Sequence, residues 1–236
     1  MRTRDILLMC FIGLSVGTCF FDDPISYRTD GGASVGSTGG NLTATAISTG
    51  PWHTCALLAD NTVKCWGRNR GMLGDGTTVD YRTTPISVSG ISTATAISLG
   101  PGFGVSTNCA LLADNTVKCW GWLGQQLSTT PVSVSGISTA TAISAGTHHS
   151  CALLADNTVK CLGTNASGQL GDGTTTSRTT PVSVSGISTA TAISIGVDHS
   201  CALLADNTVK CWGENSEGEL GDGTTTNRST PVTVQY

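Results

Sequence analysis

The segment His199–Gly213, "HSCALLADNTVKCWG", occurs in four close copies along the chain. Each copy holds two cysteines separated by nine residues; the pairs are Cys55/Cys65, Cys109/Cys119, Cys151/Cys161 and Cys201/Cys211. Paired cysteines can bind a metal, carry out redox chemistry or form a structural disulfide. The repeated segment therefore decides both the fold and whether the protein performs chemistry.

The segment predicts a β-hairpin closed by a disulfide. Residues 205–207 suit a three-residue turn, because Asn207 at its end tolerates a left-handed backbone. Cys201 then lies opposite Cys211 in a non-hydrogen-bonded pair, with Cα atoms about 4.5 Å apart, at the short end of the disulfide range. Zinc sites generally use cysteines separated by two to four residues. Redox sites favour Cys-x-x-Cys near a helix. Both alternatives fit this spacing less well.

The copies lie within repeats of about 50 residues, since their first cysteines stand at positions 55, 109, 151 and 201. Each repeat contains four short strand candidates, such as "TATAIS" (Thr189–Ser194), "CALLA" and "TVKCW" in the fourth repeat and "PVSVS" (Pro181–Ser185) in the third. The second repeat lacks the "GDGTTTxR" loop, and no segment shows a sustained helical period. The pattern predicts an all-β, propeller-like array of four blades with four short strands each.

Composition narrows the compartment and the partners. Charged residues make up 12% of the 236 residues, and the formal net charge is −4. Without a basic cluster, nucleic acid is not an expected partner. No apolar run is long enough for a transmembrane helix. Eight paired cysteines beyond the N-terminal segment indicate an oxidising compartment.

The N-terminus is typical of an export signal. Arg2 and Arg4 precede the apolar stretch Ile6–Gly17, so residues 1–21 are predicted to be a signal peptide or lipoprotein leader. A buried N-terminal strand or helix is the alternative. Cys19 ends "VGTC", which is similar to a lipidation motif, although Thr18 stands where that motif prefers a smaller residue. We expect an exported protein that is secreted, periplasmic or on the cell surface, with contact to membrane only through a lipid anchor on Cys19.

Residues 22–43 are predicted to be a Gly/Ser-rich linker, and residues 44–236 the repeat domain. Across that domain "ALLADNTVKCWGxNxxGxLGDGT" together with "TPV" resembles the regulator of chromosome condensation repeat family, whose members form β-propellers. The cysteine-paired form is similar to an exported bacterial branch of that family. The resemblance implies seven blades in the best-known members, whereas this chain has four repeats.

The chain ends bear on ring closure. The repeats start at "ATAISTG" (Ala44–Gly50) and finish at "TPVTVQY" (Thr230–Tyr236). The first repeat therefore lacks its "PVSV" strand, and the last repeat lacks its "TAIS" strand. We interpret this as an offset in which the final strand of the chain completes the first blade, which favours a closed ring. An open arc, or a homo-oligomer that completes the ring, is the alternative.

Three recurring side-chain types could carry chemistry. The histidines His53, His149 and His199 are predicted to bond a neighbouring backbone, and a metal site on the axis is the alternative. The aspartates Asp75, Asp172 and Asp222 are predicted to bond nearby amides in Gly-Asp-Gly turns, with calcium as the alternative. The tryptophans Trp66, Trp120 and Trp212 are predicted to pack between blades rather than form a ligand cage. We predict no catalytic residues, metal or cofactor.

The loop after each Cys-Trp-Gly or Cys-Leu-Gly differs among otherwise similar repeats. These rim loops comprise residues 68–73, 122–127, 164–170 and 214–220. The candidate partner-binding residues in them are Arg68, Arg70, Met72, Trp122, Gln125, Asn165, Glu214, Glu217 and Glu219. A rigid scaffold with diversified loops predicts a non-enzymatic binder of a protein or a surface glycan. The alternatives are an adhesion or structural repeat protein and a regulator of a partner enzyme, although no insertion suits the wedge of an exchange factor.

Overall fold

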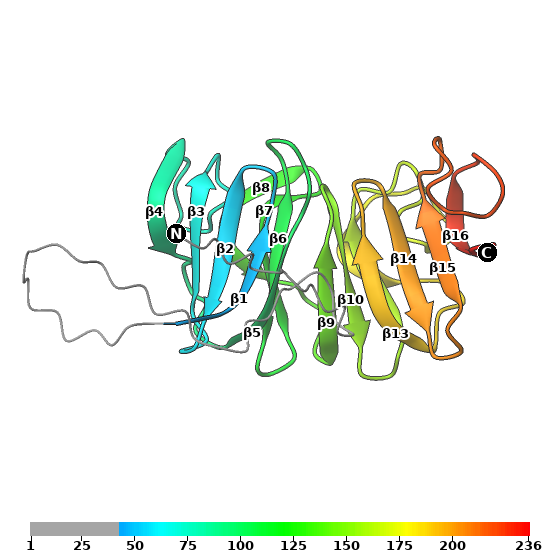
Figure 1. Cartoon of the computed structure of the whole chain (residues 1–236), viewed down its shortest axis with the longest axis horizontal. Helices are drawn as coiled ribbons and strands as arrows, with labels where there is room; N and C mark the ends of the chain where they lie inside the picture. The colour runs from blue at the N-terminus through cyan, green and yellow to red at the C-terminus, as the bar shows by residue number, and fades with distance from the viewer. Residues whose placement is uncertain (1–42) are drawn as a thin grey trace, which may run out of the picture.

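The computed structural model describes residues 43–236. The predicted leader, Cys19 and all but the last residue of the predicted linker lie outside the described residues. Strands are the only regular elements of the described part (Figure 1). The strands are β1 (Ala44–Thr49), β2 (His53–Leu58), β3 (Val63–Arg68), β4 (Tyr81–Ser87), β5 (Ala94–Leu99), β6 (Thr107–Leu112), β7 (Val117–Leu123), β8 (Gln126–Ser133), β9 (Ala140–Ala145), β10 (His149–Leu154), β11 (Val159–Gly163), β12 (Arg178–Ser183), β13 (Ala190–Ile195), β14 (His199–Leu204), β15 (Val209–Gly213) and β16 (Arg228–Thr233).

These strands form four antiparallel sheets of four strands, and each sheet follows the chain order from its first strand to its last. We call them blade 1 (β1–β4), blade 2 (β5–β8), blade 3 (β9–β12) and blade 4 (β13–β16). The prediction of an all-β array of four propeller-like blades is confirmed. Within the described residues, no helix is long and apolar enough to span a membrane.

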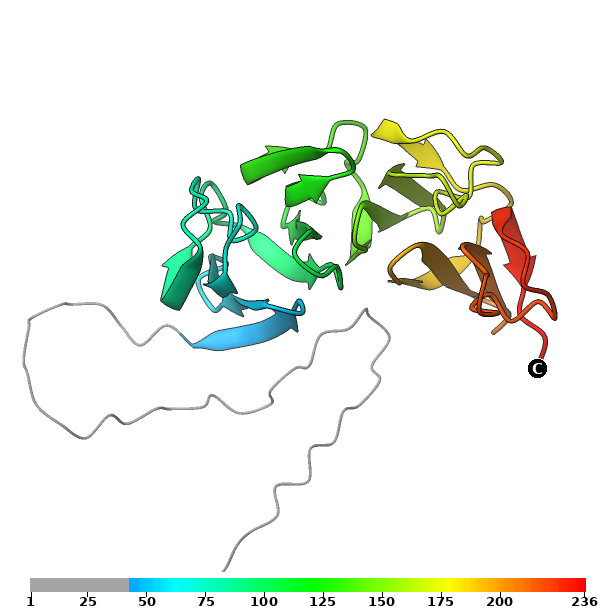
Figure 2. The same cartoon turned by 90° about the horizontal axis from the view of Figure 1, so that it is seen from above.

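The blades form an open arc with blades 1 and 4 at its two ends (Figure 2). The predicted strand offset is wrong, because β16 pairs with β15 and so completes blade 4 instead of blade 1. The physical reason is local: the "TPVS" strand folds back on the hairpin of its own repeat, as in the pairing of Val232 with Cys211. Hydrogen bonds between the described strands therefore do not close a ring.

The hairpin geometry is confirmed. Cys201 lies opposite Cys211, and the bonded pair has a Cα separation of 4.1 Å. Asn207 adopts φ 66°, which is the left-handed turn position that the sequence predicts. The other three pairs, Cys55–Cys65, Cys109–Cys119 and Cys151–Cys161, form disulfides at the same Cα separation of 4.1 Å. Each blade therefore contains one disulfide across its central hairpin.

Neighbouring blades pack through two different faces. The forward face of a blade carries the disulfide and contacts the next blade; the rear face carries small and branched apolar residues and contacts the preceding blade. In blade 3 the forward face includes Leu153 and Val159, and the rear face of blade 4 includes Ile193 and Leu204. The hydrophobic core is therefore three similar clusters, one in each contact between blades.

Candidate functional site

One loop type determines how tightly two blades join. In blades 1, 3 and 4 the rim loop continues into the Gly-Asp-Gly turn, and we call the whole segment the interblade loop (residues 69–77, 165–174 and 215–224). In blade 3 the buried Asn165 holds this loop: its Oδ1 accepts a hydrogen bond from the Leu170 amide at 2.8 Å, and its Nδ2 donates to Asp172 at 3.2 Å. The loop is thus a structural unit with its own buried polar centre.

The Gly-Asp-Gly aspartates have the structural role that the sequence predicts. Asp172 Oδ1 accepts hydrogen bonds from the Thr174 amide at 3.0 Å and the Thr174 hydroxyl at 2.8 Å. Its other oxygen lies 3.4 Å from Arg178. Burial raises the pKa of Asp172, but the hydrogen bonds from Thr174 and Asn165 and the Arg178 charge outweigh it and hold the pKa below its usual value.

The interblade loop fills the space between its own blade and the next one. Leu170 is fully buried there, against the rear face of blade 4. The indole nitrogen of Trp212 donates to the Gln169 carbonyl at 2.9 Å. Gly171 allows this approach, because its φ of +67° suits glycine and an added Cβ would lie 2.7 Å from the Trp212 nitrogen. Blade 1 uses Leu73 and the Met72 carbonyl in the same way against Trp120.

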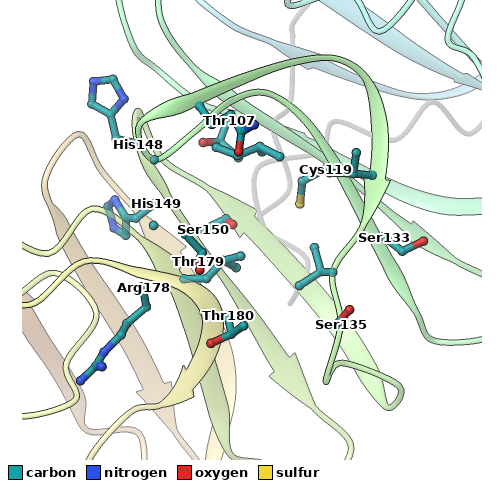
Figure 3. Close-up of a pocket in the computed structure, with 17 residues that line it drawn as sticks. Thr107, Cys119, Ser133, Ser135, His148, His149, Ser150, Arg178, Thr179 and Thr180 are labelled. Atoms are coloured by element: carbon teal, nitrogen blue, oxygen red, sulfur yellow. The ribbon is translucent and has the colours of Figure 1, made fainter.

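The contact between blades 2 and 3 lacks this arrangement. The second repeat has no Gly-Asp-Gly loop, and Leu162 stands where Trp120 and Trp212 stand in the other repeats. The two changes are chemically matched, because an indole N–H without a loop carbonyl would lose its hydrogen-bond acceptor, whereas leucine needs none. A cavity of about 200 Å³ occupies the space, which we call the interblade groove (Figure 3).

The interblade groove has an apolar interior and a polar mouth. Leu123, Val132 and Leu162 contribute apolar surface. His148 and Arg178, from blade 3, lie on one side of the groove and Ser133 on the other (Figure 3). The His148 Nδ1 atom is buried without a hydrogen-bond partner. The groove can therefore accept an apolar side chain together with hydrogen-bonding groups at its mouth.

The recurring histidines join blades. His149 Nε2 lies 3.0 Å from the Ser200 hydroxyl of blade 4, and His53 Nε2 lies 3.0 Å from Asn108 Oδ1 of blade 2. The prediction of a backbone partner is wrong for His53 and His149, because each of these two rings reaches a side chain of the next blade. Burial, with further effects from His199 and His148, lowers the pKa of His149 to about 3. Residues 43–236 hold no group of three or more His, Cys, Asp or Glu side chains placed to bind a metal ion.

The structure divides the predicted partner-binding residues into three groups. Arg70, Gln125, Glu217 and Glu219 are exposed, and Arg68, Trp122 and Glu214 are half-buried. Met72 and Asn165 are buried, with exposed fractions of 1% and 0%. The placement of these two at the surface of the rim is a correction: Asn165 organises its loop, and the Met72 carbonyl accepts the Trp120 N–H.

Sequence reasoning missed an aromatic cluster at the rim of blades 1 and 2. Trp52 is 38% exposed, and its ring makes an edge contact with Phe103 at 6.0 Å between centroids. The Arg68 guanidinium lies 4.5 Å from the Trp52 ring centroid, which is a cation–π geometry. A signal was present in the repeats, since Trp52 stands where the others have Ser106, His148 and Asp198.

Comparison with known families identifies the repeat. A family model described as "Regulator of chromosome condensation (RCC1) repeat" matches residues 44–71, 140–169 and 190–219, and a second model of that description matches residues 156–203. The chain belongs to the regulator of chromosome condensation repeat family. No curated protein matches the sequence significantly.

Three solved structures share the fold. Human WBSCR16 matches with a TM-score of 0.71 and 20% identity over 85% of this chain and 55% of its own. Yeast RCC1 (Prp20), solved bound to Kap60, matches with a TM-score of 0.73 and 18% identity over 85% of this chain and 50% of its own. Prp20p from Saccharomyces cerevisiae matches with a TM-score of 0.71 and 19% identity over 84% of this chain and 52% of its own. The RCC1-repeat chain described here therefore spans about half the length of these structures.

Proposed function

We propose that this RCC1-repeat protein is a non-enzymatic binding scaffold that takes a loop of a partner protein into its interblade groove. The observation that carries the proposal is the groove itself, because the equivalent space in the other two contacts holds a loop with a leucine. Blade 3 supplies the receiving face of this contact, as blade 4 does for the loop of blade 3. A partner segment can occupy the position that the shortened second repeat leaves open.

The size of the groove favours a side chain over a small-molecule substrate. Pockets for drug-sized ligands hold about 300–1,000 Å³, whereas this groove holds about 200 Å³. That volume suits one or two apolar side chains, as Leu170 shows at the equivalent position between blades 3 and 4. We infer that the partner presents a tight turn carrying a leucine-like side chain.

The mouth of the groove supplies polar recognition. Arg178 is 38% exposed in its side chain and lies 3.4 Å from Asp172, so part of its guanidinium can reach a carbonyl or carboxylate of the partner. The blade 2 rim loop forms the opposite wall, and its Trp122 and Gln125 extend the contact surface. Arginine and tryptophan are the side chains that most often carry binding energy in protein interfaces.

Two further findings support a protein-binding role in an oxidising compartment. Yeast Prp20 was solved in complex with Kap60, and Prp20p was described with its binding to Gsp1p and histones, so related propellers bind proteins. The four disulfides are typical of exported proteins, and we propose that this chain acts in the periplasm, at the cell surface or outside the cell.

The experiment selects peptides from a displayed library on the oxidised protein and measures their affinity by fluorescence anisotropy. A graft variant replaces residues 122–127 with residues 164–177 and carries Leu162→Trp, so that the groove receives the protein's own loop. We expect peptides with a central leucine in a turn, and at least a tenfold loss of affinity for the graft variant.

The matched control is the double variant Lys64→Ser/Asp80→Ser, which removes one positive and one negative side chain on blade 1, away from the groove, and should leave the affinity unchanged. Selected peptides that bind the graft variant as tightly as the original chain would overturn the proposal. A graft variant that does not fold is recognised by circular dichroism. The single variant Leu162→Trp, which narrows the groove without the insertion, then gives the same test.

A further inference from the structure

The two ends of the arc expose faces that are covered everywhere else. On the forward face of blade 4, Cys201, Leu203 and Val209 are half-buried, whereas Cys151, Leu153 and Val159 of blade 3 are buried. On the rear face of blade 1, Ala44 is exposed, whereas its counterparts Ala94, Ala140 and Ala190 are fully buried. Each end is therefore one half of a contact between blades.

We propose that two copies of this chain associate head to tail, with blade 4 of each copy packing on blade 1 of the other, and so close one ring. A twofold axis relates the two identical contacts, which is the commonest symmetry of protein dimers. A ring of two such chains lies within the range of about four to eight blades that propellers form. The contacts between blades 1 and 2 and between blades 3 and 4 indicate which atoms would meet.

The interblade loop of blade 4 is complete, and no further blade follows it within residues 43–236. Leu220 occupies the position of Leu73 and Leu170, and Gly221 keeps the positive φ of +62°. An added Cβ at Gly221 meets only Val234, whereas at Gly171 it would meet the Trp212 indole. Trp66 of blade 1 is the counterpart of Trp212 and is only half-buried. In the dimer the Trp66 indole of one copy donates to the Glu219 carbonyl of the other.

Main-chain and serine hydrogen bonds between blades give a second match. The Ser48, Ser98 and Ser144 hydroxyls accept from amides of the next blade at 3.0–3.1 Å. Ser194 is the counterpart in blade 4 and is exposed, so its hydroxyl would accept from the Thr49 amide of the second copy. The Gly76 and Gly173 amides donate to carbonyls of the next blade, so the Gly223 amide would donate to the Thr83 carbonyl of the second copy.

The histidine position gives a third match. His53 and His149 each reach the residue before the first cysteine of the next blade, namely Asn108 and Ser200. His199 is only half-buried at the open end of blade 4. The corresponding residue of blade 1 is Thr54, whose hydroxyl would be the partner of His199 in the second copy.

Charge complementarity makes the two end faces attractive to each other. The rim loop of blade 4 carries Glu214, Glu217 and Glu219, whereas that of blade 1 carries Arg68 and Arg70. Between blades 3 and 4, Gln169 donates to Asp198 at 3.0 Å. Glu219 and Trp52 are the counterparts of these two residues, and Arg68 lies on the Trp52 ring. The Arg68 Nε atom is buried without a hydrogen-bond partner, and Glu219 of the second copy would supply one.

These matches favour a second copy over an unrelated partner. The forward face of blade 4 and the rear face of blade 1 belong to copies of one repeat type, and the three contacts within the chain already join these two types of face. An unrelated partner would have to reproduce both faces separately. One self-association covers both with groups that the chain already contains.

The test is sedimentation equilibrium of the oxidised chain over a range of concentrations. We expect a reversible dimer of twice the 24.1 kDa chain mass. The variants Arg68→Glu and Glu219→Arg should each weaken association by about 30-fold or more, since breaking a desolvated charge pair costs about 2 kcal/mol or more. The double variant should recover most of the lost affinity. Lys160→Glu makes the same change of charge as Arg68→Glu, but on blade 3 and away from both end faces, and should leave association unchanged.

A chain that stays monomeric at every concentration would overturn the proposal. So would an open-ended series of larger species, because head-to-tail contacts that do not close generate filaments. Equal weakening by Lys160→Glu would show that the effect is net charge rather than the proposed pair. Circular dichroism of each variant separates loss of association from loss of folding.

Discussion

The contact between blades 3 and 4 and the contact between blades 2 and 3 are built from the same repeat, yet only the first is filled. Between blades 3 and 4, Leu170 and Trp212 are fully buried and joined through the Gln169 carbonyl. Between blades 2 and 3, the loop is missing and Leu162 is half-buried beside a groove. The missing loop and the leucine at position 162 thus separate a structural contact from a candidate binding site.

This difference shows how a repeat protein can lose a loop and keep its fold. Loss of the loop alone would leave a buried indole N–H without an acceptor, at a cost of about 1–3 kcal/mol. Leucine at position 162 avoids that cost because it carries no polar group. The remaining defect is missing apolar volume, which a partner can supply. The two contacts therefore differ in buried side-chain volume, in the pairing of buried polar groups and in titratable side chains. Each of these three properties can be altered separately by substitution.

The largest effect is expected from Leu170→Ala. This substitution removes a fully buried side chain from the filled contact, so we expect the free energy of unfolding to fall by about 2–5 kcal/mol. Leu162→Ala makes the same chemical change beside the open groove, where the lost volume joins an existing cavity, and we expect less than half that loss. Urea denaturation under oxidising conditions measures both values. Equal losses would mean that the two contacts do not differ in packing.

The hairpins of this protein can be predicted from its sequence, whereas the contacts between its blades cannot. The hairpin register, the turn at Asn207 and the cysteine pairing follow from local spacing, and the sequence predicts them correctly. The missing loop of repeat 2 is also visible in the sequence. Its consequence is not, because which blade the loop reaches depends on how separate sheets pack. For the same reason sequence placed Met72 and Asn165 at the surface and gave the last strand to the wrong blade.

The disulfides provide the second test of the comparison. Cys151–Cys161 and Cys109–Cys119 close loops of equal length, each with a sequence separation of 10. Replacing either pair with alanines should therefore remove the same entropic contribution, about 2.5–3 kcal/mol in the chain-entropy model. Cys151 and Cys161 face the filled contact, whereas Cys119 lines the groove. We expect the Cys151→Ala/Cys161→Ala variant to lose about 1 kcal/mol more, because its cavity is enclosed.

The difference between the two double variants is the informative quantity, since the loop-closure contribution cancels in it. Urea denaturation with matched slopes measures that difference. Its disappearance, or a larger loss for Cys109→Ala/Cys119→Ala, would show that the groove side is as well packed as the filled side. Mass mapping of the remaining disulfides in each variant checks that no cysteine has changed partner.

The third test concerns pH, and of the two contacts compared it acts only on the one between blades 3 and 4. His149 reaches across to Ser200 there, whereas Thr107 holds the same position between blades 2 and 3 and does not titrate. Because the folded pKa of His149 is lowered from 6.5 to about 3, the unfolded chain binds a proton below pH 6.5 that the folded chain does not. The free energy of unfolding should therefore fall by up to about 1.4 kcal/mol per pH unit from this group as pH decreases. Burial also lowers the pKa of His53, so the total slope is steeper.

His149→Gln keeps a hydrogen-bonding group without the charge and should reduce the slope between pH 6 and 4.5 in urea denaturation. The interblade-loop aspartates, whose pKa values are lowered, lose their contribution only at more acidic pH, so they do not mask the effect. An unchanged slope in His149→Gln would place the pH sensitivity outside the contact between blades 3 and 4.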